Sequence, residues 1–120
     1  MLLDHVLSVD DNRIMQDIHG DIFKHFSKKV SVAMSGQEAI DMIKRDRFDL
    51  ILLDLHMPKM NGIDTAKAIR ASGVNTPIIA VTGNDATEDR AACQAVGING
   101  FVPKPIDDDL LLDEIKRLCH

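Results

Sequence analysis

The sequence contains no tryptophan, no tyrosine and only two cysteines among its 120 residues. Those cysteines, Cys93 and Cys119, lie far apart and form no Cys-x-x-Cys or Cys/His spacing, which argues against a redox pair or a zinc site. We expect both to be reduced thiols, as is usual in cytosolic proteins. Because the chain also lacks a basic run and a set of stacking aromatic residues, direct binding to nucleic acid is disfavoured.

Long apolar runs are missing as well. No stretch approaches the ~18–20 residues that a membrane span needs, and the start at residues 1–5 is too short and too acidic for a signal peptide. Acidic residues outnumber basic ones by 19 to 14, and 45% of the residues are hydrophobic. This composition and length predict a single globular domain over residues 1–120, located in the cytoplasm without a membrane span.

Short runs of branched apolar residues recur along the chain, and most of them lack the alternation of a strand with one solvated face. They therefore predict strands covered on both faces of a sheet. The five runs are Val6–Val9, Val30–Ala33, Leu50–Leu53, Ile78–Val81 and Gly100–Val102.

Helical patterns lie between these runs. Apolar residues recur at three- or four-residue spacing in three segments: Met15, Ile18, Ile22 and Phe26; Ala39, Ile40 and Ile43; Leu111, Ile115 and Leu118. Helix starts are predicted at Ser35, with Glu38 three residues later, and at Asn84–Asp85, while Gly73 and Gly97 predict helix ends. Gly20 lies inside the first helical segment, where glycine costs about 1 kcal/mol relative to alanine.

Five strands that alternate with five helices predict a doubly wound α/β fold of the flavodoxin-like type. Its parallel sheet is expected to have the strand order 2-1-3-4-5 and helices on both faces. In such sheets ligands bind at the carboxyl ends of the strands, near the point where the strand order reverses. The chemistry of the chain should therefore be sought at that edge.

Polar residues follow four of the predicted strands at their carboxyl ends. Asp10 and Asp11 follow the first strand, Asp54 the third, Thr82 the fourth and Lys104 the fifth. Each alone has an ordinary explanation, such as a helix cap, strand-end packing or a surface lysine. Together they predict three carboxylates, one hydroxyl and one ammonium group at one edge of the sheet.

Three neighbouring carboxylates repel one another unless a cation compensates their charge. Mg²⁺ suits such a set because it prefers oxygen ligands, keeps several waters and takes one or two protein carboxylates. A carboxylate beside Mg²⁺ can also attack phosphorus and form an aspartyl phosphate, while the metal and a lysine neutralise the transferring group. The residues thus favour a magnesium-dependent phosphoryl-transfer site.

Four motifs carry a resemblance to the receiver domain of two-component response regulators, of the single-domain or hybrid-kinase and phosphorelay type. They stand in the order and spacing of that family and, with the predicted strands, extend the resemblance over essentially the whole chain. The motifs are Val9–Asn12, Leu53–Gly62, Val81–Gly83 and Pro103–Pro105.

The resemblance implies a role for each matched residue. Asp54 would accept a phosphoryl group from a phosphohistidine. Asp11 would ligate Mg²⁺ directly, Asp10 would do so directly or through water, and the backbone carbonyl of His56 would supply a further ligand. Asp54 would complete the metal ligands, and Lys104 would pair with the phosphate.

The resemblance also implies a switch and two kinds of partner. Thr82 would turn toward the phosphate while the ring of Phe101 moves inward behind it. A sensor histidine kinase or histidine phosphotransfer protein would dock near the first helix and the Asp54 edge. A downstream target protein or output domain would contact the face formed by the fourth helix, the fifth strand and the fifth helix. The domain would not be an enzyme beyond its own phosphorylation and dephosphorylation.

Two other functions stay open at this point. One is a pseudo-receiver, an interaction module that never carries phosphate, although all five expected positions are filled. The other is a Mg²⁺-dependent phosphatase with an Asp nucleophile, but such enzymes typically place a second Asp two residues later, where this chain has His56. Whether the domain stands alone or was excised from a larger regulator or hybrid kinase also stays open.

Overall fold

The computed structural model describes residues 3–55, 62–82, 87–103 and 106–118, with all their side chains except those of residues 82 and 87–90. Five strands and five helices alternate along this part of the chain. They are β1 (Leu3–Val9), α1 (Arg13–Phe23), β2 (Ser27–Ala33), α2 (Gly36–Arg45), β3 (Leu50–Asp54), α3 (Gly62–Ala71), β4 (Ile78–Thr82), α4 (Thr87–Ala95), β5 (Gly100–Pro103) and α5 (Asp108–Leu118). Among the described helices, none has the length and apolar character to span a bilayer.

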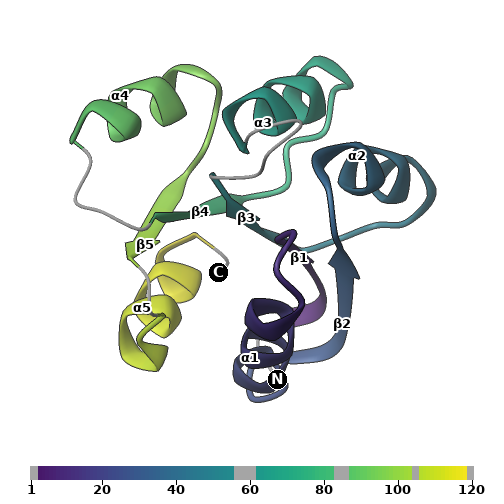
Figure 1. Cartoon of the computed structure of the whole chain (residues 1–120), viewed down its shortest axis with the longest axis vertical. Helices are drawn as coiled ribbons and strands as arrows, with labels where there is room; N and C mark the ends of the chain where they lie inside the picture. Colours follow the sequence, from purple (N-terminus) through teal and green to yellow (C-terminus); the bar gives the residue numbers. More distant parts are fainter. Residues whose placement is uncertain (1–2, 56–61, 83–86, 104–105, 119–120) are drawn as a thin grey trace.

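The strands form one parallel sheet of order β2-β1-β3-β4-β5, which confirms the predicted fold class and strand order. Helices α2, α3 and α4 cover one face of the sheet, and α1 and α5 cover the other (Figure 1). All five predicted apolar runs fall inside the observed strands. The strands are a little longer than predicted because strand pairing continues into the residues that flank each run.

Alternate residues of the strands feed two separate apolar layers. On one face Leu7, Ile51 and Leu53 pack in a cluster with Ala66 and Ile69 of α3. On the other face the apolar residues are Val6, Leu50, Leu52, Ile79, Val81 and Val102, together with Phe23 of α1 and Leu111 and Ile115 of α5. Each fully buried aliphatic side chain contributes about 1.5–3 kcal/mol. These two layers hold the strands, and therefore their carboxyl ends, in fixed register.

Local signals at the helix ends are confirmed where the structure describes them. The Ser35 side chain accepts a hydrogen bond of 3.1 Å from the Glu38 amide and so caps α2. Gly73 and Gly97, just after α3 and α4, have φ values of 88° and 92°, which favour glycine. The predicted start at Asn84–Asp85 lies outside the described residues.

The inward face of α1 differs from the prediction. The helix ends at Phe23, and its buried residues are Gln16, His19 and Phe23, whereas Ile18 is 45% exposed. Gln16 and His19 turn inward because the hydroxyl of Ser8 on β1, which is fully buried, lies within hydrogen-bonding distance of both side chains. The apolar spacing located the helix correctly but assigned Ile18 to the wrong face.

Gly20 offers a direct test of the packing around α1. A methyl group built at this position would meet nothing within 4 Å. Gly20→Ala should therefore raise the free energy of unfolding by about 0.5–1 kcal/mol, since alanine reduces the entropy lost on forming the helix without any steric cost. Urea unfolding measures the change, and a lower unfolding midpoint would show that the helix surface is more crowded than the structure indicates.

Candidate metal and phosphoryl-transfer site

The register of two neighbouring strands brings two carboxylates together. Val9 of β1 pairs with Leu53 of β3, so Asp10, which follows β1, and Asp54, which ends β3, lie next to each other. Asp10 is 1% exposed and Asp54 is 3% exposed. Two acidic side chains thus stand at the carboxyl end of the buried central strands, as the sequence predicted.

Asp11 completes the cluster from the solvent side. One carboxylate oxygen from each of Asp10, Asp11 and Asp54 can be chosen so that all three lie within 4.8 Å of one another. Asp11 is exposed, so the cluster is buried on one side and open on the other. Two ionised carboxylates at that separation repel by about 3 kcal/mol at an effective dielectric constant of about 20.

The chemistry of these donors fits Mg²⁺. All three are hard oxygen ligands, and their combined negative charge is best compensated by a divalent cation. The open side leaves room for the waters that Mg²⁺ retains. An enclosed cage of protein ligands, as many Ca²⁺ sites require, is not formed by the described residues.

Backbone hydrogen bonds fix the turn that carries Asp10 and Asp11. The Asp10 amide donates to the Ala33 carbonyl of β2 at 3.1 Å, and Asp10 Oδ1 accepts from the Asn12 amide at 2.9 Å. Asn12 in turn caps α1, since its side chain accepts from the Met15 amide at 3.1 Å. The start of α1 and the position of the Asp10 carboxylate are therefore coupled.

Gly62 packs directly against the backbone that carries Asp54. Its amide donates to the Leu55 carbonyl at 3.2 Å. A Cβ atom at this position would lie 2.6 Å from the Asp54 carbonyl oxygen and 2.7 Å from Leu55 Cα. Only a residue without a side chain fits there, because the two nearest atoms it would meet belong to the main chain. Sequence reasoning included Gly62 in a motif but did not assign it this packing role.

Of the other predicted site residues, the structure describes the backbone of Thr82 and the whole of Phe101. Thr82 ends β4 and pairs with Pro103 of β5, so the carboxyl ends of these strands are adjacent. Phe101 is half-buried and packs against the apolar layer beneath α2, α3 and α4. The Thr82 side chain, His56 and Lys104 lie outside the described residues, and their roles stay predictions.

Residues 6–116 of the chain match the response regulator receiver domain family. The chain belongs to this family. Receiver domains are signalling modules of two-component systems and are generally not classed as enzymes. The resemblance seen in the four sequence motifs is thereby confirmed at the level of the family.

Among curated relatives, the transcriptional regulatory protein CpxR of Escherichia coli K12 is 35% identical over 118 residues. This match covers 98% of the chain but 50% of the relative. The chain therefore spans about half the length of this relative.

Two solved structures add chemical context. The receiver domain of sensor histidine kinase PA1611 from Pseudomonas aeruginosa PAO1, which has a magnesium ion coordinated in its active site cleft, is similar with a TM-score of 0.86 and 29% identity over 97% of each chain. The co-crystal structure of the Saccharomyces cerevisiae histidine phosphotransfer protein Ypd1 and the receiver domain of Ssk1 gives a TM-score of 0.83 and 29% identity, covering 97% of this chain and 88% of the matched chain.

Gly62→Ala tests the close packing at Asp54. The added methyl group must displace main-chain atoms, so the free energy of unfolding should fall by about 1–3 kcal/mol. The amide resonances of Asp54 and Leu55 should also shift. Gly20→Ala is the matched control because it makes the same chemical change where the structure has open space. Equal unfolding free energies for the two variants would contradict this description of the site.

Proposed function

We propose that this receiver domain, extending over residues 1–120, accepts a phosphoryl group on Asp54 from a phosphohistidine with the help of Mg²⁺. The observation that carries the proposal is the convergence of buried Asp54 with Asp10 and Asp11 at the carboxyl edge of the sheet. A phosphorylated Asp54 would then alter the surface of the domain, which regulates a partner or passes the phosphate on.

The chemistry follows from the position of Asp54 at the end of a rigid strand. Its carboxylate oxygen attacks the phosphorus atom and forms a new P–O bond, while the P–N bond of the phosphohistidine breaks. The electron pair of that bond stays on the imidazole nitrogen, which takes up a proton from solvent. Because β3 pairs on both sides, the attacking oxygen is held without a large entropic cost at the moment of transfer.

In this proposal Mg²⁺ is held by Asp10, Asp11, Asp54 and the backbone carbonyl of His56. When bound, the ion neutralises charge on the phosphoryl oxygens and on the three carboxylates. Lys104, which follows Pro103 beside the end of β4, would pair with the phosphate from the other side. The fit rests on the donor set and on the adjacency of the strand ends.

The switch would use β4, which pairs with β3, and β5, which lies on the far side of β4. Thr82 ends β4 and would hydrogen-bond the phosphoryl group, and Phe101 on β5 would move inward to fill the space that Thr82 leaves. Phe101 is half-buried against the core, so a small rotation of its ring changes how much apolar surface it exposes. A downstream target or output domain would bind the face made of α4, β5 and α5.

Asp54→Asn tests the phosphoacceptor. Wild type incubated with Mg²⁺ and acetyl phosphate should gain a single phosphoryl adduct by intact-mass spectrometry, and EDTA should prevent it. Asp54→Asn should gain none, because the amide is not a nucleophile toward phosphorus. An equal adduct on the variant would contradict the assignment.

Beryllofluoride, a phosphoryl mimic that does not hydrolyse, separates a short-lived phosphate from an inert site. Wild type should bind it in the presence of Mg²⁺ even if the adduct is lost too quickly to detect. Absence of both the adduct and beryllofluoride binding would instead favour the pseudo-receiver. Multiple turnover of small phosphate esters would favour the phosphatase.

The outer face of α1 supplies a docking surface for the phosphodonor protein. Ile14 is 72% exposed and Ile18 is 45% exposed, and their spacing places them on the same face of the helix. They follow directly after the turn that carries Asp10 and Asp11. Exposed apolar side chains next to a reactive site are the residues that a protein partner most readily buries.

Ile14→Ser tests this surface. It should slow phosphoryl transfer from a purified histidine phosphotransfer protein by about tenfold, as expected for an apolar anchor of an interface. Phosphorylation by acetyl phosphate should not change. Gln37→Ser is the matched control, since Gln37 is also exposed and also occupies the second position of its helix, on α2 at the other face of the sheet. Equal slowing by both variants would remove α1 from the docking surface.

A further inference from the structure

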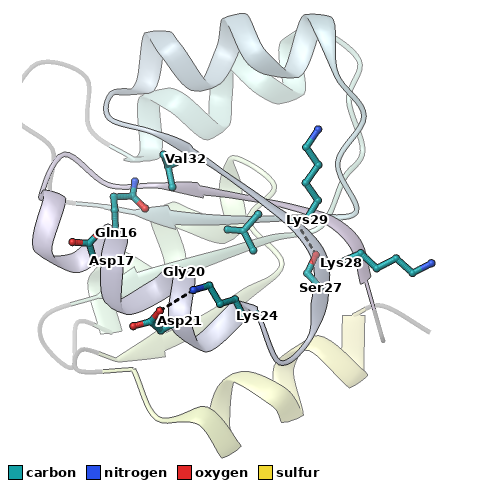
Figure 2. Close-up of a pocket in the computed structure, with 10 residues that line it drawn as sticks. Gln16, Asp17, Gly20, Asp21, Lys24, Ser27, Lys28, Lys29 and Val32 are labelled. Atoms are coloured by element: carbon teal, nitrogen blue, oxygen red, sulfur yellow. Dashed lines mark hydrogen bonds and ion pairs between the residues drawn. The ribbon is translucent and has the colours of Figure 1, made fainter.

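Gln16 is a polar side chain of α1 buried next to the acidic cluster. It lies at one end of a groove of about 770 Å³ between α1 and β2, and its side chain points toward the sheet (Figure 2). Only 5% of Gln16 is exposed. Of the three lysines that line the groove, Lys28 and Lys29 extend away from it, whereas Lys24 pairs with Asp21 (Figure 2). Gln16 thus differs from Lys28 and Lys29 of the groove in being buried and directed toward the sheet.

The amide group of Gln16 bridges three parts of the backbone. Its Nε2 donates to the carbonyls of Ser8, Asp10 and Ala33 at 3.0, 2.9 and 3.0 Å. Its Oε1 accepts a hydrogen bond of 2.7 Å from the Ser8 hydroxyl. One side chain therefore joins the carboxyl ends of β1 and β2 to each other and to the first turns of α1.

Asp10 is held from several directions because of this bridge. Its carbonyl accepts from Gln16, its amide donates to Ala33, and its Oδ1 accepts from the Asn12 amide. The Ala33 carbonyl accepts from both Gln16 and the Asp10 amide, so Gln16 fixes both ends of that contact. A rotation of the Asp10 backbone would disturb the bonds that its carbonyl and its amide make.

We infer that Gln16 is a positioning residue for the metal site, which aims the Asp10 carboxylate at Mg²⁺ through the Asp10 main chain. This inference rests on the proposed magnesium site. Residues that hold a metal ligand in place commonly change metal affinity when they are replaced. Gln16 touches neither phosphate nor metal in this account, and it acts only through Asp10.

The side chain needed here is a primary amide of this length. Two N–H bonds serve the three carbonyl oxygens, while the amide oxygen receives the Ser8 hydroxyl. A glutamate at position 16 would direct a carboxylate at three carbonyl oxygens and repel them. A methionine fills similar space but donates nothing, which makes it the cleaner replacement.

Gln16→Met tests the inference by calorimetric titration with Mg²⁺. The dissociation constant should rise about tenfold, in the range typical of outer-shell replacements. The initial rate of phosphorylation by acetyl phosphate, measured against Mg²⁺ concentration, should need more Mg²⁺ for half-saturation but reach a maximal rate near that of wild type. An unchanged dissociation constant, or a lower maximal rate with unchanged half-saturation, would overturn the inference.

Ser8→Ala is the matched control within the same network. It removes the hydroxyl that Gln16 Oε1 accepts from but keeps the three bonds donated by Nε2. It should lower the unfolding midpoint as Gln16→Met does, yet change the Mg²⁺ dissociation constant by less than about twofold. Equal weakening of Mg²⁺ binding by both variants would show general loosening of the fold and overturn the inference. If wild type itself binds no Mg²⁺, the proposed function fails first.

A measurement on wild type avoids any loss of folding in the variants. The side-chain amide signals of Gln16 in a ¹H–¹⁵N spectrum should shift during Mg²⁺ titration with the same midpoint as metal binding. Those of Gln37, exposed on α2, should not move. Gln16 signals that stay fixed while Mg²⁺ binds would overturn the inference.

Discussion

The parallel pairing of β1 with β3 is the constraint on which the rest of the site depends. The register that sets Val9 opposite Leu53 also sets Asp10 next to Asp54, and a shift of one residue would separate them. Residues 6–9 of β1 and all of β3 are buried, so the two apolar layers oppose such a shift. The stability of the core is thus used to hold two like charges together. The repulsion of about 3 kcal/mol between such charges is small beside the burial of many apolar side chains.

The need to keep the ends of β1 and β3 in register is also met by close contacts around the site. Gly62 lies against the Asp54 carbonyl, and Gln16 bridges the ends of β1 and β2. Both contacts restrict the movement of the main chain at this edge of the sheet. These contacts hold main-chain atoms, and one carboxylate oxygen from each Asp lies within 4.8 Å of those of the other two. The site is therefore rigid in its backbone and open toward solvent at Asp11. That combination suits a group that must bind an ion and then receive a phosphoryl group.

Sequence reasoning predicted the strands, their order and the acidic cluster because each depends on a strong local pattern. Buried parallel strands are continuous apolar runs, and residues after them must lie at one edge whatever the details of packing. The helix ends at Gly73 and Gly97 were predictable because few residues other than glycine adopt a positive φ readily. The inward face of α1 was not predictable in this way. Amphipathic spacing assigns a glutamine such as Gln16 to solvent, and only the three-dimensional meeting of β1, β2 and α1 shows that three carbonyl groups require its amide.

Helix α1 has a proposed role on each of two faces, and this arrangement would have a consequence for the proposed transfer of phosphate to the domain. Its inner face holds Asp10 through Gln16, while Ile14 and Ile18 on its outer face are open to a partner. A protein that docks on the outer face would therefore contact the element that is proposed to orient the metal ligand. Because Asn12 caps the helix and also donates to Asp10 Oδ1, the two faces are linked at the first turn as well. An effect on docking and an effect on the metal site can be told apart only by comparing substitutions on the outer face of α1 with substitutions on its inner face. A phosphodonor protein would for this reason have a route to influence the site that a small phosphodonor lacks.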